Sequence, residues 1–155
     1  LRYDPDMGSD ARLSCSSSGL AWMAALSDEQ ALALVSQQGI GQPEEYGPNA
    51  PRTLQEVLAT VAATRERGYS ITQETYTPGL NAMAAPVRFN GQPPIGIISI
   101  AGPSVRFTEA RMQALAPELL SFAGQMAAAS GASPYFSPTA NQPPSDPERR
   151  PIYAA

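Results

Sequence analysis

The stretch LNAMAAPVRFNGQPPIGIISIAG, residues 80–102, decides the fold of this sequence. Two apolar runs flank Asn90-Gly91, and this arrangement is the strongest short-range signal of a β-hairpin. We therefore predict two antiparallel strands. Because side chains alternate between the faces of a strand, Ile98 and Ile100 share one face. The other face of the second strand carries Ile97, Ser99 and Ala101.

The residues before the hairpin change from a helical period to a strand period. Apolar residues recur at helical spacing after Thr53, whose side chain is placed to cap a helix. Gly68 is a typical helix stop. YSITQETYT, residues 69–77, then predicts a short strand, followed by a turn at Pro78-Gly79.

Further helices are expected toward both ends of the chain. Two of them occupy residues 18–26 and 27–38, and a longer one begins at Thr108 and ends near Gly131. The expected buried stripe of the long helix is Met112, Leu115, Leu119, Phe122 and Met126. Helices before and after hairpin-joined strands predict an α+β domain, with helices packed on one face of an antiparallel sheet.

The end of the chain differs in composition from the rest. Residues 133–155 are rich in proline and offer little to bury, which is typical of a flexible tail. We therefore predict a folded domain at residues 1–132 and a tail at residues 133–155.

Composition limits the chemistry that the chain can perform. Its 155 residues and 43% hydrophobic content fit one domain, and a net charge of −4 argues against a face that holds nucleic acid. No apolar run reaches the roughly 20 residues that span a bilayer. Because histidine is absent, neither a Ser-His nor a Cys-His nucleophile can be built. The sequence thus predicts no catalytic residue, no metal and no cofactor, and its single cysteine fits a cytoplasmic protein.

SCSSSG, residues 14–19, places more hydroxyl groups before a helix than one cap requires. One interpretation is that Ser16 or Ser17 caps the helix while the other hydroxyls face solvent. The alternative is that Ser17 and Ser18, together with the free N–H groups of the helix, bind a carboxylate.

Small residues on the predicted sheet raise a similar choice. Leu80 and Ala82 point the same way on one strand, and Ser99 and Ala101 share a face of the next. This patch either packs closely against a helix or leaves a cavity for a small molecule. Thr72 either lies in a solvated loop or points into that cavity.

Three stretches, in this order, resemble the effector-binding domain of the IclR family of bacterial transcriptional regulators. They are SCSSSGLAWMAALSDEQ, TLQEVLATVAATRERGYSITQETYTPGLNAMAAPVRF and IGIISIAGPSVRFTEARMQAL, and together they span most of residues 8–131. The middle stretch is the most specific, since Arg-Gly-Tyr, Pro-Gly and Ala-Ala-Pro-Val occur in it at the family's intervals.

The resemblance implies a GAF-like fold whose first strands are missing here, and a ligand sensor rather than an enzyme. It also implies a small organic or aromatic acid as effector, a homodimer or tetramer, and DNA binding only through a winged helix-turn-helix domain outside this chain. An oligomerisation module that binds no ligand is the alternative, and a hydrolase is a weaker one. The positions that match the family's effector pocket are Ala11, Ser17, Ser18, Thr72, Leu80, Ala82, Ser99 and Ala101.

The sequence departs from the family pattern at several of these places. Ser14 stands where histidine is frequent, and Leu20 where lysine or arginine is frequent. Thr72 stands where an acidic residue is common, and Ala82 stands where cysteine can occur. The change at Thr72 removes a negative charge from the expected pocket, which favours a more anionic or bulkier ligand.

Overall fold

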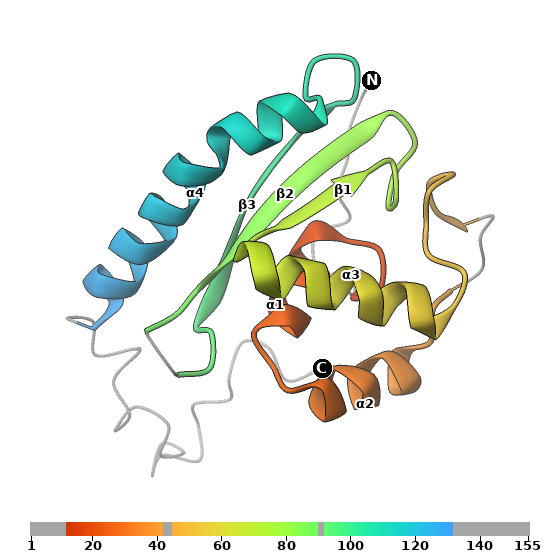
Figure 1. Cartoon of the computed structure of the whole chain (residues 1–155), viewed down its shortest axis with the longest axis horizontal. Coiled ribbons are helices and arrows are strands. Elements are labelled where there is room, and N and C mark those ends of the chain that lie inside the picture. Colours follow the sequence, from red (N-terminus) through yellow and green to blue (C-terminus); the bar gives the residue numbers. More distant parts are fainter. Residues whose placement is uncertain (1–11, 42–44, 90–91, 132–155) are drawn as a thin grey trace, which may run out of the picture.

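The computed structural model describes residues 12–41, 45–89 and 92–131. Three strands form one antiparallel sheet with the order β1-β2-β3 (Figure 1). The predicted α+β class is therefore confirmed, although Asn90-Gly91 and the predicted tail lie outside the described residues. The elements are α1 (Ser17–Ala24), α2 (Asp28–Gln38), α3 (Leu54–Arg67), β1 (Ser70–Gln73), β2 (Leu80–Val87), β3 (Gly96–Pro103) and α4 (Glu109–Ser130).

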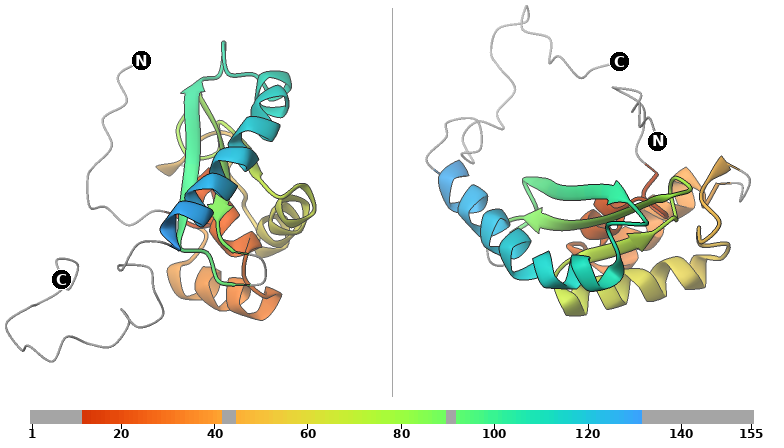
Figure 2. Two further views of the ribbon diagram at one scale, coloured as in Figure 1. Left: turned by 90° about the vertical axis from the view of Figure 1, so that its left-hand side faces the viewer. Right: turned by 90° about the horizontal axis from the view of Figure 1, so that it is seen from above.

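Helices cover both faces of the sheet, so the prediction that they pack on one face is wrong. Met83, Ala85 and Val87 of β2 point to one face and form a hydrophobic core with α4. Ser70 of β1 points to the other face, where its hydroxyl donates to the backbone oxygen of Ser17 at 2.8 Å. This bond holds α1 against the second face, and Figure 2 shows the sheet between the helices.

The long helix α4 buries a different stripe from the predicted one. Met112 and Leu119 are buried as expected, but Phe122 and Met126 are 54% and 49% exposed, so that part of the prediction is wrong. Small side chains take their place and let α4 lie close to the sheet. The buried residues of the stripe are Met112, Ala116, Leu119, Ala123 and Ala127.

A second hydrophobic core joins α1, α2 and α3. Met23 of α1, Val35 of α2 and Val57 of α3 are almost fully buried in it. Arg65 of α3 links this helix to the end of α1, because its guanidinium donates to the backbone oxygens of Ala24 and Leu26 at 3.1 and 3.0 Å. Arginine therefore satisfies carbonyl groups at the end of α1, a position where helices leave them unpaired.

β3 lies at one edge of the described sheet. Its backbone pairs with β2 alone among the described residues, and Ser99, Ile100 and Ala101 are exposed. The exposed Phe122 and Met126 belong to the neighbouring helix α4. No residue of β3 carries a charge, so this edge is a continuous uncharged strand.

Candidate functional site

Two of the four hydroxyl groups in residues 14–19 form hydrogen bonds with backbone groups. Ser16 is the cap of α1: its hydroxyl accepts from the N–H of Gly19 at 3.1 Å and donates to the backbone oxygen of Arg12 at 2.6 Å. Ser14 donates to the backbone oxygen of Ile40 at 3.1 Å, which ties this segment to the end of α2. Ser16 is thus the helix cap, as one interpretation expected. The other half of that interpretation is wrong for Ser14 and Ser17, because both are buried and do not face solvent. Carboxylate binding by Ser17 and Ser18 stays a prediction.

The structure brings five predicted pocket positions onto one face of the sheet. Thr72, Ala82 and Ala101 are direct cross-strand partners, so they form a row across β1, β2 and β3. Ser99 lies in the next row, and Leu80 at the other end of β2 points to the same face. Ser99 and Ala101 are exposed, so this part of the face is open.

Of the predicted pocket positions near the start of the chain, two lie close to this face of the sheet and one lies outside the described residues. Ser17 adjoins the Ser99 row, because its backbone oxygen accepts from Ser70 and Ser70 shares that row. Ser18 follows it in α1 and is half-buried. Ala11 lies outside the described residues.

A cavity of about 340 Å³ lies beside β1, and Thr72 alone of the predicted positions lines it. The start of α1, the loop before α3 and the first turns of α3 supply the other walls. The loop is held against the end of β1, since the backbone N–H of Asn49 donates to the oxygen of Glu74 and its side-chain amide donates to Gln73. The lining residues are Ser14, Cys15, Leu20, Asn49, Ala50, Pro51, Arg52, Glu56, Thr60, Ile71, Thr72 and Thr75.

Arg52 and Glu56 bring opposite charges to this cavity. One oxygen of Glu56 is occupied by the cap of α3, where it accepts from the N–H groups of Arg52 and Thr53 at 2.7 and 3.2 Å. Among the described residues, no side chain forms an ion pair or hydrogen bond with the guanidinium of Arg52. Arg52 is exposed and lines the cavity, so its guanidinium is suited to bind a carboxylate through two parallel hydrogen bonds.

Sequence reasoning missed Arg52 and Asn49 because they lie in a loop without a periodic pattern. The available signal was the position of Arg52, a lone cation between a proline and the capping box of a helix. Loops held by a rigid scaffold often carry binding residues, so a cation there favours a binding role.

The family model described as "Bacterial transcriptional regulator IclR C-terminal" matches residues 1–128. The chain belongs to the IclR family. The transcriptional repressor IclR of Escherichia coli K12 is 33% identical to it over 112 residues, which are 72% of this chain and 40% of that protein. The acetate operon repressor of Salmonella typhimurium LT2 is 28% identical over 84% of this chain and 47% of its own length. The chain thus spans less than half the length of these IclR-family repressors.

Solved structures show the same fold. The transcriptional regulator YaiJ matches with a TM-score of 0.73 and 21% identity, over 86% of this chain and 73% of that chain. The inducer-binding domain of PobR from Acinetobacter, a double mutant in complex with 3-hydroxybenzoic acid, matches with a TM-score of 0.70 and 19% identity. That match covers 82% of this chain and 73% of the PobR chain.

Two kinds of feature are absent from the described part of this IclR-family domain. No helix among the described residues is long and apolar enough to cross a membrane. The described ranges also contain no cluster of three or more histidine, cysteine, aspartate or glutamate side chains that could hold a metal ion.

Cys15 is buried in the wall of the cavity as a neutral thiol. Burial raises its pKa from 9.0 to about 11, although a hydrogen bond with Ser14 and the charge of Arg12 act in the opposite direction. A thiol with this pKa is almost entirely protonated at neutral pH and is a poor nucleophile.

The raised pKa of Cys15 predicts a loss of stability at alkaline pH. Below pH 9 the thiol keeps its proton in both states, whereas between about pH 9 and 11 only the unfolded chain releases it. Rising pH then favours unfolding. Between pH 8 and pH 10.5, the free energy of unfolding measured in urea should therefore fall more for the parent than for Cys15→Ala, in which this thiol is absent. Equal losses would contradict the prediction.

Proposed function

We propose that this domain senses a small organic acid and, as part of a longer cytoplasmic regulator, controls DNA binding by a winged helix-turn-helix domain. The proposal includes assembly as a homodimer or tetramer. Family membership supports the regulatory role. The uncharged edge of β3 and the exposed Phe122 and Met126 of α4 support association between copies. A ligand-free oligomerisation module is the alternative.

The observation that carries the sensing role is the guanidinium of Arg52 at the cavity, which has no side-chain partner within the described ranges. The cavity volume of about 340 Å³ suits a small metabolite. In this proposal Arg52 binds the acid group, and Thr72 belongs to the wall nearest the sheet. The other predicted positions, from Ser17 to Ala101, are the competing location for the same ligand.

Substitution of Arg52 tests the proposal. A thermal-shift panel of small carboxylic acids should contain compounds that raise the melting temperature, because a ligand that binds only the folded state stabilises it. For such a compound, Arg52→Gln should weaken binding about ten- to hundredfold in isothermal titration, since a hydrogen bond to a charged group contributes about 1.5–3 kcal/mol.

Two further variants make the result specific. Arg106→Gln removes an exposed arginine outside the cavity and should leave the affinity unchanged. Ser18→Ala tests the competing location on the sheet face. If Ser18→Ala weakens binding and Arg52→Gln does not, the acid group lies at the start of α1 instead. If no acid binds the parent, the ligand-free alternative holds.

A further inference from the structure

We propose that the ligand of this cavity is a hydroxylated aliphatic acid, in preference to an aromatic acid or an unsubstituted fatty acid. The inference rests on the proposed function, because it assumes that an acid binds beside Arg52. It goes further because it infers which groups the rest of the ligand carries, from the hydrogen bonds that the hydroxyl groups of the cavity wall already form.

The hydroxyl groups of the cavity wall have already donated their protons. Thr60 donates to the backbone oxygen of Glu56 at 2.9 Å, and Thr72 to that of Ala82 at 3.1 Å. Thr75 donates to the backbone oxygen of Cys15 at 2.6 Å. Ser14 likewise donates to a backbone oxygen. A carbonyl oxygen has no proton to give, so the direction of these four bonds is fixed.

A hydroxyl group that has donated its proton can only accept further hydrogen bonds. Thr60, Thr72 and Thr75 therefore have lone pairs left to accept from a molecule in the cavity, whereas Ser14 is buried and its hydroxyl also hydrogen-bonds with the Cys15 thiol. Glu56 adds a carboxylate, of which one oxygen serves the helix cap. Together these groups form a wall of acceptors, with Arg52 as the main donor.

A ligand that matches this wall carries an acceptor at one end and donors along the rest. A carboxylate satisfies Arg52, and hydroxyl groups on the attached carbons donate to the threonine oxygens. A benzene ring or an alkyl chain has no such donors, so it would displace water from these acceptors without replacing the hydrogen bonds. Sites built to bond a hydroxyl group reject the analogue that lacks it more strongly than apolar pockets reject an extra methylene.

The apolar part of the lining limits the size of the ligand without favouring a ring. Leu20 and Ile71 provide the larger apolar surfaces, and Ala50 and Pro51 the smaller ones. Among the described lining residues no aromatic side chain is present on which a ring could stack.

Matched pairs of acids test the inference on the parent domain. Isothermal titration would compare glycerate with propionate and gluconate with hexanoate, and benzoate would represent aromatic acids. We expect the hydroxylated member of at least one pair to bind about tenfold or more tightly than its partner, which corresponds to one or two hydrogen bonds. Ordinary apolar binding would give the opposite order, because hexanoate and benzoate bury more apolar surface.

A threonine variant then connects the preference to the wall. Thr60→Val keeps the shape of the side chain but removes its acceptor oxygen, so it should weaken the hydroxylated acid severalfold and leave its deoxygenated partner unchanged. Thr77→Val, outside the cavity, is the matched control and should change neither affinity.

The outcomes separate the two proposals. If propionate, hexanoate or benzoate binds as tightly as the hydroxylated acids, this inference is overturned while acid sensing stands. If none of the five acids binds, the assignment of an acid to this cavity fails, and the inference fails with it.

Discussion

Gly19→Ala should lower the free energy of unfolding by about 3 kcal/mol, because the new methyl group has no room. A Cβ atom at this position would lie 2.4 Å from the Cα of Leu13 and 2.6 Å from its backbone oxygen. Both neighbours are backbone atoms, so a change of side-chain rotamer cannot relieve the contact.

The segment that contains Leu13 also cannot withdraw without loss. The backbone N–H of Leu13 donates to the side chain of Gln38 at 2.8 Å, and Arg12 accepts from Ser16 through its backbone oxygen. The methyl group would have to separate α1 from this segment and break these bonds. The expected loss therefore exceeds the gain of about 1 kcal/mol that alanine brings to a helix over glycine.

Gly124→Ala is the matched control, since Gly124 also lies in a helix but an added Cβ atom there would have no neighbouring atom within 4 Å. It should leave the stability unchanged or raise it slightly through helix propensity. Urea unfolding of both variants, with the parent, measures the difference. Equal effects of the two substitutions would show that the approach of Leu13 to α1 is not a tight packing contact.

Gly47→Ala should have the second large effect, and it should act on the cavity. A Cβ atom at Gly47 would lie 1.8 Å from the backbone oxygen of Glu74. This oxygen also accepts from Asn49 at 3.3 Å, and the N–H of Gly47 donates to the oxygen of Thr75 at 3.1 Å. The loop before α3 must therefore leave the turn between β1 and β2.

The expected cost of Gly47→Ala is about 2–4 kcal/mol, from the loss of several hydrogen bonds of about 0.5–1.5 kcal/mol each. The displaced loop carries Asn49 and Arg52, so acid binding should weaken as well. Hydrogen exchange at the amides of Gly47 and Asn49 should become faster, whereas exchange in β2 should change little. Gly96→Ala, with open space around the added methyl group, is the control. Unchanged exchange at Asn49 would refute this account of the loop.

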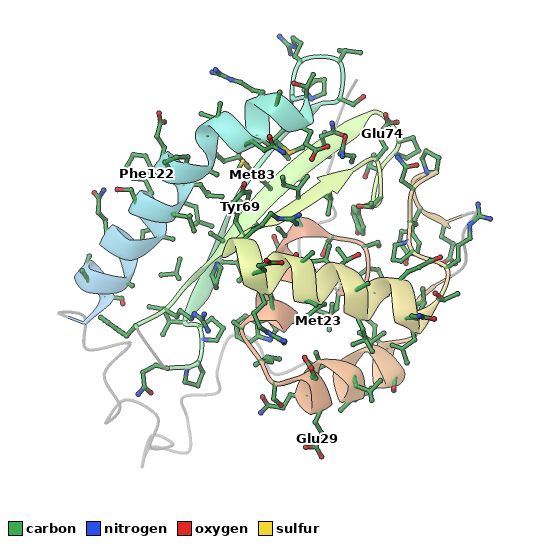
Figure 3. The ribbon with its side chains drawn as sticks, viewed as in Figure 1. Met23, Glu29, Tyr69, Glu74, Met83 and Phe122 are labelled. Carbon is green, nitrogen blue, oxygen red and sulfur yellow. The ribbon has the colours of Figure 1, made fainter. Side chains whose placement is uncertain are left out.

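Patterns within single elements predicted the fold well. The cap at Thr53, the helix start at Thr108 and the stop at Gly68 all occur in the structure, because each depends on residues a few positions apart. The pairing of β2 with β3 was predicted for the same reason. Figure 3 shows Met83 under α4 and Met23 beneath α3, the two cores that these elements form.

Contacts between distant segments could not be predicted in the same way. Helical spacing allowed two stripes on α4, and only the approach of small alanine side chains to the sheet selects the one without Phe122, whose exposed position Figure 3 shows. Arg65 of α3 bonds the end of α1, more than 40 residues before it in the sequence, and no local pattern indicates this contact. The cavity likewise combines Arg52 with Cys15 and Thr75, which no sequence period relates.

At high protein concentration, the outer edge of β3 can serve as a template for strand addition. No described residue pairs with its outward N–H and C=O groups, so these can pair with an extended chain. Its sequence contains isoleucine at alternate positions and no charge that would repel a second copy. Only Pro103 at its end interrupts such pairing. A chain segment that covered this edge would therefore also protect it from aggregation, and we expect preparations in which the edge is uncovered to stay monodisperse only at low concentration.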